Sequence, residues 1–155
     1  MDRVIRGILN EGKVRVFFAD ISSSCKEICS LHNCTPVASD ALSRLLSVGA
    51  IMGEMQKKGR LTLRIDSCGP IKLMLVDASA DGNIRGFVAN PDADVPLTSR
   101  NTLDVSKAVG ELGFITVIKE KGYHKVLLHY GKESIIKNGL YDKIINSLKS
   151  NNIGY

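Results

Sequence analysis

Residues 60–90 read RLTLRIDSCGPIKLMLVDASADGNIRGFVAN, and this stretch predicts the core of the fold. Its first seven residues alternate the apolar side chains of Leu61, Leu63 and Ile65 with polar ones. A period of two residues is typical of a β-strand, because successive side chains point to opposite faces of a sheet. We therefore expect a strand with one solvated face at the start of the stretch.

Two further strands are expected within the same stretch. Residues 71–77 are apolar on both faces apart from Lys72, which favours a central strand that is covered on both faces. The sequence Asp-Gly-Asn at 81–83 predicts a tight turn, since Gly and Asn tolerate the positive φ that such turns need. A third strand follows over 84–89, so the stretch forms a meander that the rest of the chain would cover or extend.

The elements outside the meander follow from the same rules. Before the meander we expect a strand over 13–20, in which Val14, Val16 and Phe18 alternate, a short helix that is capped by the serines at 22–24 and ends at 33, and a long helix over about 35–58. After the meander we expect an irregular segment over 90–107 and strands over 112–119 and 125–130. A last helix is expected over 134–149, with Ile136, Leu140, Ile144 and Leu148 on one stripe. These elements predict an α+β fold in a single domain. Its mostly antiparallel sheet would be covered by the long apolar helix and by shorter helices.

The long helix over 35–58 has clear start signals. Thr35 is a good N-cap, and Pro36 lacks only an amide hydrogen that would stay unpaired in the first turn. The middle of the helix has few polar residues, and Gly49 and Gly53 are four residues apart. We expect a helix that is buried on most of its circumference, with the two glycines allowing close approach to the sheet.

The composition is that of an ordinary globular domain. At 155 residues, with 44% hydrophobic and 24% charged residues, the chain is long enough to bury a core in one domain. No apolar run reaches the length of a membrane span, and the first ten residues carry charges where a secretory signal would be apolar. We therefore expect a cytoplasmic protein, in which cysteines stay reduced.

The net charge of +5 is concentrated towards the end of the chain. Residues 119–149 contain seven lysines and three acidic residues, so they carry +4 of this charge. A lysine-rich segment is usually a solvated face, and a chain without Trp and with 5% aromatic residues does not favour stacking on nucleobases. A basic nucleic-acid-binding module stays as an alternative function, and its binding would weaken steeply with salt.

Four cysteines and one histidine are the main candidates for metal or redox chemistry. Cys25, Cys29 and His32 fall on one face of the short helix, and Cys34 follows it. A structural zinc site would use paired short motifs such as C-x-x-C, and the sequence has none. Buried or incidental thiols are the default interpretation, and Cys68 stands alone in a turn. No catalytic group, phosphate-binding loop or metal-ligand set is recognisable, so we predict neither an enzyme nor a cofactor.

Several segments of the chain, taken in order, resemble one known family. They are TPVASDALSRLLSVGAIMGEMQKKG (35–59), RLTLRI (60–65), VDASADGNIRG (76–86) with Asn90-Pro91 after it, and LDVSKAVGELGFITVIKEKG (103–122). Together they resemble the N-terminal domain of the thirty-three kilodalton chaperonin, a redox-regulated heat-shock chaperone. The likeness covers about residues 1–122, and residues 123–155 form a divergent basic tail.

The resemblance implies a holdase, a chaperone that binds unfolding client proteins without ATP and prevents their aggregation. In that family a C-terminal domain binds zinc through a C-x-C and a C-x-x-C pair, and oxidation of these thiols releases the zinc and exposes the client surface. The present sequence contains neither pair, so we expect client binding without this zinc or its redox switch. Expected partners are unfolded or partly folded client proteins, and a homodimer is left open.

A hydrophobic client surface is expected on the long helix and the meander, with Met52, Met55 and Phe87 as the candidate client-binding residues. Thioether side chains repack easily against apolar partners, although methionines at such positions usually belong to a core. The tail has two open explanations: a shifted or interrupted reading frame of a longer gene, which translation of the downstream DNA would reveal, and a divergent paralogue without the switch. A non-functional remnant is a further alternative, and a broad, non-cooperative melt would reveal it.

Overall fold

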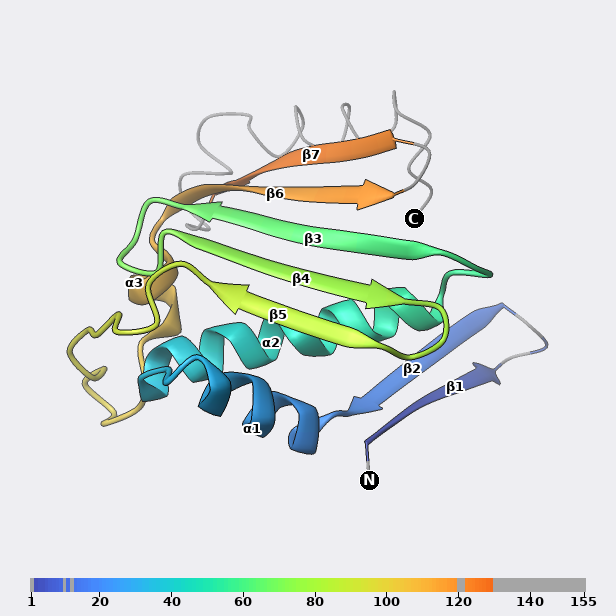
Figure 1. Cartoon of the computed structure of the whole chain (residues 1–155), viewed down its shortest axis with the longest axis horizontal. Helices are drawn as coiled ribbons and strands as arrows, with labels where there is room; N and C mark the ends of the chain where they lie inside the picture. The colour runs from blue at the N-terminus through green and yellow to red at the C-terminus, as the bar shows by residue number, and fades with distance from the viewer. Residues whose placement is uncertain (1, 10, 12, 120–121, 130–155) are drawn as a thin grey trace.

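The computed structural model describes residues 2–9, 11, 13–119 and 122–129 (Figure 1). In chain order the elements are β1 (Arg3–Leu9), β2 (Val14–Asp20), α1 (Ser22–Leu31), α2 (Pro36–Glu54), β3 (Arg60–Ser67), β4 (Leu73–Ser79), β5 (Ile84–Val88), α3 (Val105–Val109), β6 (Leu112–Lys119) and β7 (Gly122–His129). The predicted α+β class with antiparallel sheets is confirmed. The helix predicted over 134–149 lies outside the described residues, and the division of the chain at residue 122 stays a prediction.

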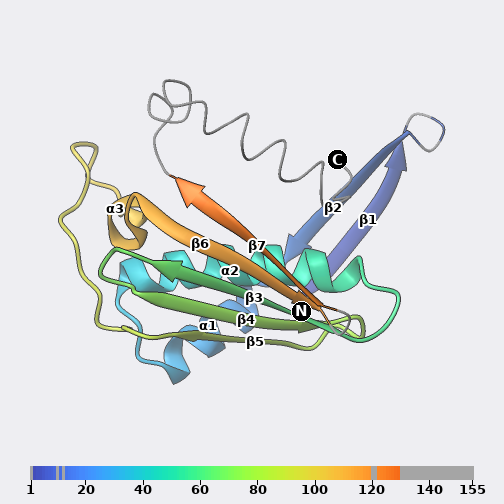
Figure 2. The ribbon, with the colours of Figure 1, turned by 90° about the horizontal axis from the view of Figure 1, so that it is seen from above.

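The predicted meander forms one side of a five-stranded antiparallel sheet with the order β5-β4-β3-β6-β7. Strands β6 and β7 extend the sheet on the free side of β3, as Figure 1 shows. Strands β1 and β2 form a separate hairpin with seven residue pairs. Figure 2 shows this hairpin rising beside one end of α2 and pointing away from the five-stranded sheet.

Helix α2 packs against the meander through its two glycines, as predicted from their spacing. A Cβ atom on Gly49 would lie 2.5 Å from Cγ1 of Val76, and one on Gly53 would lie 3.0 Å from the carbonyl oxygen of Ser79. Larger side chains would therefore push the helix off β4. The largest fully buried side chains come from α2, from the meander and from the turn before β4: Val37, Leu42, Leu46, Leu61, Leu63, Ile71, Met74, Val76 and Val88.

The start of α2 follows the sequence signals, but its end does not. The side chain of Thr35 accepts a hydrogen bond from the amide of Ala38, and Pro36 is the first helical residue. The helix ends at Glu54 with Met55 as its C-cap, so the predicted end at 58 is wrong by four residues. The two lysines at 57 and 58 lie beyond the helix, and one long side of α2 carries exposed residues such as Arg44 and Val48.

Three other predictions need correction. Strand β4 begins at Leu73 because Lys72 has a φ of +67°, and in the described structure it is buried on one face only, through Met74, Val76 and Ala78. The prediction of a doubly covered strand is therefore wrong. A short helix, α3, lies within the segment predicted as irregular, and Asp104 caps it by accepting a hydrogen bond from the Lys107 amide.

The N-terminal segment holds two further differences. No strand is predicted over 3–9 from the sequence, yet β1 lies there. Helix α1 ends at Leu31 rather than at 33, and the serines at 22–24 lie inside its first turn instead of capping it. The cap is supplied from a distance by Asp2, whose carboxylate accepts hydrogen bonds from the amides of Ser23 (3.0 Å) and Ser24 (2.7 Å).

Candidate functional site

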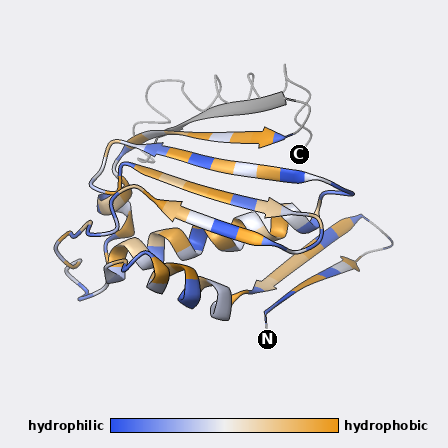
Figure 3. Ribbon diagram, viewed as in Figure 1, coloured by the Kyte–Doolittle hydropathy of each residue, from blue (hydrophilic) through white to orange (hydrophobic). Residues whose placement is uncertain are grey.

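One face of the β1–β2 hairpin gathers exposed apolar side chains. The register places Ile5 opposite Phe18 and Leu9 opposite Val14, and Val16 lies opposite a glycine, so these five apolar residues share one face. Their side chains are 44–57% exposed. We call these five residues, Ile5, Leu9, Val14, Val16 and Phe18, the hairpin face. Figure 3 shows the hydrophobic colour along most of β2.

The opposite face of the hairpin is its attachment to the rest of the molecule. Val4, Phe17 and Ala19 are half-buried there, and Ala19 packs against the hydrophobic core. The guanidinium of Arg6 lies 3.9 Å from the carboxylate of Glu54, near the end of α2. Because this second face is turned to α2, the hairpin face is directed away from the core.

Asp2 fixes the start of the hairpin to α1. Hydrogen bonds from the side chain and amide of Ser24, with smaller contributions from Ser23, lower the pKa of the Asp2 carboxyl to about 2. A carboxylate at a helix N-terminus satisfies amides that have no partner within the helix and interacts favourably with the helix dipole. The hairpin is therefore held at its base as well as on its inner face.

The three predicted client-binding residues lie in different surroundings. Met52 is half-buried and packs against the core, whereas Met55 is exposed at the end of α2. Phe87 is exposed on β5, and its ring meets the imidazole of His32 edge-on, with 5.9 Å between ring centroids. The client-binding role of the three residues stays a prediction. The hairpin face was not predicted as a site, since the alternation of Val14, Val16 and Phe18 signals a strand and does not reveal which of its faces is covered.

The face of the five-stranded sheet that α2 does not cover is mixed in character. Phe87, Phe114 and Ile118 are exposed on it. Between them lie polar and charged groups, including the pair of Arg64 with Asp66 at 2.6 Å and the pair of Arg85 with Asp77 at 3.7 Å. This face is therefore less apolar than the hairpin face.

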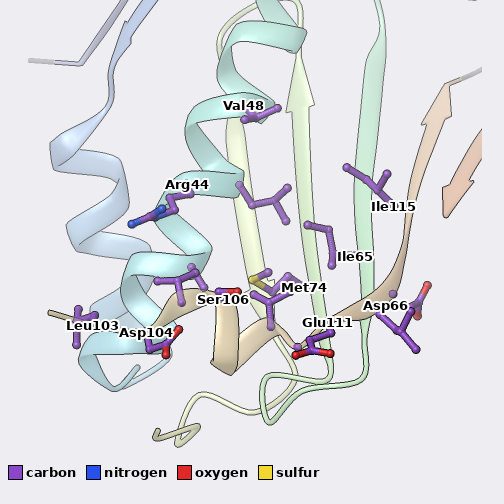
Figure 4. Close-up of a pocket in the computed structure, with 17 residues that line it drawn as sticks. Arg44, Val48, Ile65, Asp66, Met74, Leu103, Asp104, Ser106, Glu111 and Ile115 are labelled. Carbon is purple, nitrogen blue, oxygen red and sulfur yellow. The ribbon is translucent and has the colours of Figure 1, made fainter. Parts of the chain in front are cut away.

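A second apolar feature is a groove of about 440 Å³ between α2, α3 and the strands β3 and β6. Figure 4 shows Val48 of α2, Ile65 of β3 and Ile115 of β6 around it, with Leu103 at one end. Asp104 and Glu111 lie at the same end of the groove. A cavity of this size with a mainly apolar lining is typical of a binding site.

The cysteines of α1 face α2. The thiol of Cys29 lies 3.7 Å from both the Ser39 carbonyl oxygen and the Ser43 hydroxyl, and the thiol of Cys25 lies 3.9 Å from the Ser43 carbonyl oxygen. Burial, partly opposed by a hydrogen bond to Ser43, raises the pKa of Cys25. Burial and the neighbouring Cys29 raise the pKa of Cys34 to about 11, so both thiols are protonated and weakly reactive at neutral pH.

His32 does not join these thiols. Its Nε2 donates to the carbonyl oxygen of Gly86 on the outer edge of β5, at 2.9 Å. In the described part of the chain no group of three or more Cys, His, Asp or Glu residues could hold a metal ion. Cys68 is exposed, and its sulfur accepts a hydrogen bond from the Leu112 amide at 3.3 Å. The structure thus gives the cysteines packing and hydrogen-bonding roles.

Two further predictions concern membrane insertion and nucleic-acid binding. Among the helices in the described ranges, none is both long and apolar enough to cross a membrane. Most of the lysine-rich segment over 119–149 lies outside the described residues, so the nucleic-acid-binding alternative stays a prediction.

Comparison with known proteins gives a consistent result. The family described as "Hsp33 protein" matches residues 2–135. This match extends past residue 122, where the resemblance in the sequence motifs ends. The 33 kDa chaperonin of Clostridium botulinum (strain Loch Maree / Type A3) is 39% identical over 123 residues, which are 78% of this chain and 42% of that protein. The 33 kDa chaperonin of Geobacillus sp. (strain WCH70) is 39% identical over 122 residues, 78% of this chain and 41% of that protein.

A solved structure agrees with the sequence relatives. The crystal structure of the 33 kDa chaperonin from Thermotoga maritima matches with a TM-score of 0.75 and 25% sequence identity, over 89% of this chain and 49% of that one. The present chain therefore spans about two fifths of the length of these curated relatives and half of the solved structure.

Proposed function

The chain belongs to the Hsp33 family, and from this premise we propose that it is a holdase chaperone, which binds unfolding proteins without ATP and prevents their aggregation. The observation that carries the proposal is the hairpin face, where five large apolar side chains are exposed side by side. Unfolding proteins expose apolar segments, and burying apolar area from both partners is the main favourable contribution to such contacts.

The size of the hairpin face fits reversible binding. Complete burial of a Val, Leu, Ile or Phe side chain contributes about 1.5–3 kcal/mol, and these five side chains are already about half buried. Association offsets part of this gain through lost translational and side-chain freedom. We therefore expect weak contacts that hold a client and release it again.

The hairpin also offers backbone groups to a client. It is a two-stranded sheet, so each strand has one edge without a strand partner in the described structure. An extended client segment could add to either edge through main-chain hydrogen bonds while its apolar side chains cover the hairpin face. Such binding depends little on the client sequence, as a holdase requires.

Within these 155 residues we propose that client binding needs no oxidation. The sequence contains neither the C-x-C nor the C-x-x-C pair, and the thiols of Cys25 and Cys34 are protonated at neutral pH. The hairpin face is exposed while all four cysteines are free. We also propose a cytoplasmic location, because free thiols are usual there.

Light scattering from a heat-unfolding reporter enzyme tests the proposal, with the chain added before and after treatment with hydrogen peroxide. Equal suppression of aggregation in both states is expected. No suppression in either state would overturn the chaperone proposal. Suppression only after peroxide would overturn the claim that oxidation is not needed.

A pair of variants tests the hairpin face itself. Val16→Ser combined with Phe18→Ser removes the centre of the face and should weaken suppression strongly, while urea unfolding stays near that of the unchanged chain. Leu31→Ser is the matched control, since Leu31 is equally apolar and 74% exposed but lies on α1. Equal activity of both variants would assign client binding to another surface.

A second copy of the chain is the alternative occupant of the hairpin face. Mass measurement by light scattering distinguishes the two occupants. A dimer that Val16→Ser with Phe18→Ser converts to monomer would identify this face as the dimer interface. A monomer at working concentration leaves the face for clients.

A further inference from the structure

Three of the four cysteines lie together in a cleft between α1 and α2 that the proposed function does not use. The cleft has a volume of about 860 Å³, and Cys25, Cys29 and Cys34 line it together with Lys26, Asn33 and serines of both helices. Cys25 and Cys34 are half-buried, and Cys29 is buried at the wall of the cleft. A small thiol reagent can therefore reach this cluster from solvent.

The end of α1 brings two of these cysteines together. Asn33 has a φ of +51°, and its amide donates a hydrogen bond to the Ser30 carbonyl oxygen at 3.1 Å. The Cys34 amide donates to the Cys29 carbonyl oxygen at 3.0 Å. These two bonds around a left-handed residue define a Schellman motif, in which the side chains of the outer two residues frequently pack together. Here the outer two residues are Cys29 and Cys34.

The titration of Cys34 agrees with this contact. Burial raises the pKa of the Cys34 thiol to about 11, and the neighbouring Cys29 contributes through its charge and through a hydrogen bond between the two side chains. Such a bond requires that the two sulfur atoms are neighbours. The pair is therefore adjacent by its backbone geometry and by its side-chain interaction.

Cys25 lies close to the same pair but is placed less favourably for a disulfide. Cys25 and Cys29 are four residues apart within α1, and Cβ atoms at this spacing on a helix are about 5–6 Å apart. The Cβ atoms of a disulfide are about 3.5–4.5 Å apart, so a bond between these two cysteines would distort the helix. Cys34 lies beyond the end of α1, where the backbone is not part of the helix. Cys29 and Cys34 are therefore the pair that closes with the smaller change in the backbone.

We propose that Cys29 and Cys34 form an intramolecular disulfide by exchange with a low-molecular-weight disulfide such as oxidised glutathione. The Cys34 thiolate attacks one sulfur of the small disulfide, which gives a mixed disulfide and releases one small thiolate. The Cys29 thiol then loses its proton and attacks the Sγ atom of Cys34, and the second small thiolate leaves. The protons of the two cysteines pass to the two released thiolates. The two cysteines are oxidised, and the small disulfide is reduced to two thiols.

The disulfide would act on the end of α1. His32 lies between the two cysteines in the chain and donates to the Gly86 carbonyl oxygen on the edge of β5 at 2.9 Å. A bond between residues 29 and 34 closes a loop around His32 and restricts the unfolded chain, so we expect the oxidised chain to resist urea better. The pair has neither C-x-C nor C-x-x-C spacing, and the inference does not depend on the holdase proposal.

Oxidation of the full chain tests this proposal. The chain is equilibrated without oxygen at mildly alkaline pH in buffers with rising ratios of oxidised to reduced glutathione, quenched with acid, and blocked with N-ethylmaleimide in urea. Trypsin places Cys29 and Cys34 together on peptide 27–44 and Cys25 on peptide 16–26. We expect a peptide 27–44 that is two hydrogen atoms lighter than its reduced form and carries neither N-ethylmaleimide nor glutathione. Urea unfolding of the oxidised chain should have a higher midpoint.

Two variants make the result depend on the pair. Cys25→Ser is the matched control, because it removes a thiol from the same cleft, and it should leave the disulfide in place. Cys34→Ser should leave Cys29 free to react with N-ethylmaleimide, and the rise in the urea midpoint should disappear. If Cys34→Ser does not unfold cooperatively, Cys34→Ala takes its place.

Each contrary outcome overturns the proposal. These outcomes are glutathione retained on Cys34 beside a blocked Cys29, a disulfide between peptides 16–26 and 27–44, and a reduced pair at ratios where the exposed Cys68 already carries glutathione. A disulfide that forms without raising the urea midpoint overturns its proposed action on the end of α1.

Discussion

The β1–β2 hairpin and the β3–β4 pair are built alike and packed differently. Each is antiparallel with seven residue pairs in register, and each has one apolar face. On β3 and β4 that face is buried at residues such as Leu63 and Val76, and Ile65 at its end is half-buried. On the hairpin the corresponding side chains, such as Val16 and Phe18, are about half exposed.

The difference between the two pairs lies in what covers them. Gly49 and Gly53 let α2 approach β4 closely enough for Val76 to fill the space that a side chain on the helix would need. The hairpin turns its mixed face to α2 and its apolar face outward. An apolar strand face is therefore evidence of burial only when a helix or second sheet is available to cover it.

The largest change in stability is expected when one buried side chain of α2 is removed. Leu46 is fully buried, so Leu46→Ala should destabilise the chain by about 2–5 kcal/mol through lost apolar contact and a residual cavity. Phe18→Ala on the hairpin face is the partner variant, and it should stay within about 0.5 kcal/mol. Urea unfolding measures both. Equal losses would show that the hairpin face is covered in solution.

Two glycine substitutions, one on α2 and one on the hairpin, test the close packing. We expect them to change the stability of the chain in opposite directions. Gly49→Ala brings a methyl group against Val76, and overpacking of about 1–3 kcal/mol should exceed the helix-propensity gain of about 1 kcal/mol. Nothing lies within 4 Å of a Cβ placed on Gly7, so Gly7→Ala should be neutral or stabilise by up to about 1 kcal/mol. Thermal unfolding decides the two signs.

The edge of β5 offers a smaller test. His32 covers this edge by donating a hydrogen bond to the Gly86 carbonyl oxygen at 2.9 Å. His32→Ala should lower stability by about 0.5–1.5 kcal/mol, the usual net contribution of one hydrogen bond. His32→Gln, whose amide can donate to the same carbonyl, is the control and should recover part of the loss in a urea titration.

The smallest effect concerns the link between the hairpin and α1. The pKa of Asp2 is lowered to about 2 by hydrogen bonds from Ser24 and Ser23, so its charged form stabilises the fold above the ordinary carboxyl pKa. That contribution is present above about pH 4 and is lost as the pH falls through about 2. The stability difference between the unchanged chain and Asp2→Asn should therefore narrow over this range. A stability difference that does not change with pH would show that Asp2 does not cap α1.

Local sequence patterns predicted the positions of most helices and strands, but few of the contacts that these elements make. The alternation at Leu61, Leu63 and Ile65 and the turn at 81–83 are local signals, and the strands β3 and β5 lie where they indicate. The end of α2 was predicted too late because the lysines and glycine beyond Glu54 resemble a helix end, although the last turn closes at Met55. Asp2 could not be predicted as the cap of α1, since the two are separated by the whole hairpin.

The features of the fold and of the candidate site can be separated by what determined them. The sequence by itself determined the α+β class, the meander, the start of α2 with its packing glycines, and the family, because these depend on periodicity, backbone preference and residues read in order. Only the tertiary structure decided that the hairpin face is exposed, that the cysteines of α1 pack on α2 while His32 turns to β5, and that a groove opens beside Leu112. Exposure and proximity depend on which faces meet in space, and a pattern along the chain does not record that meeting.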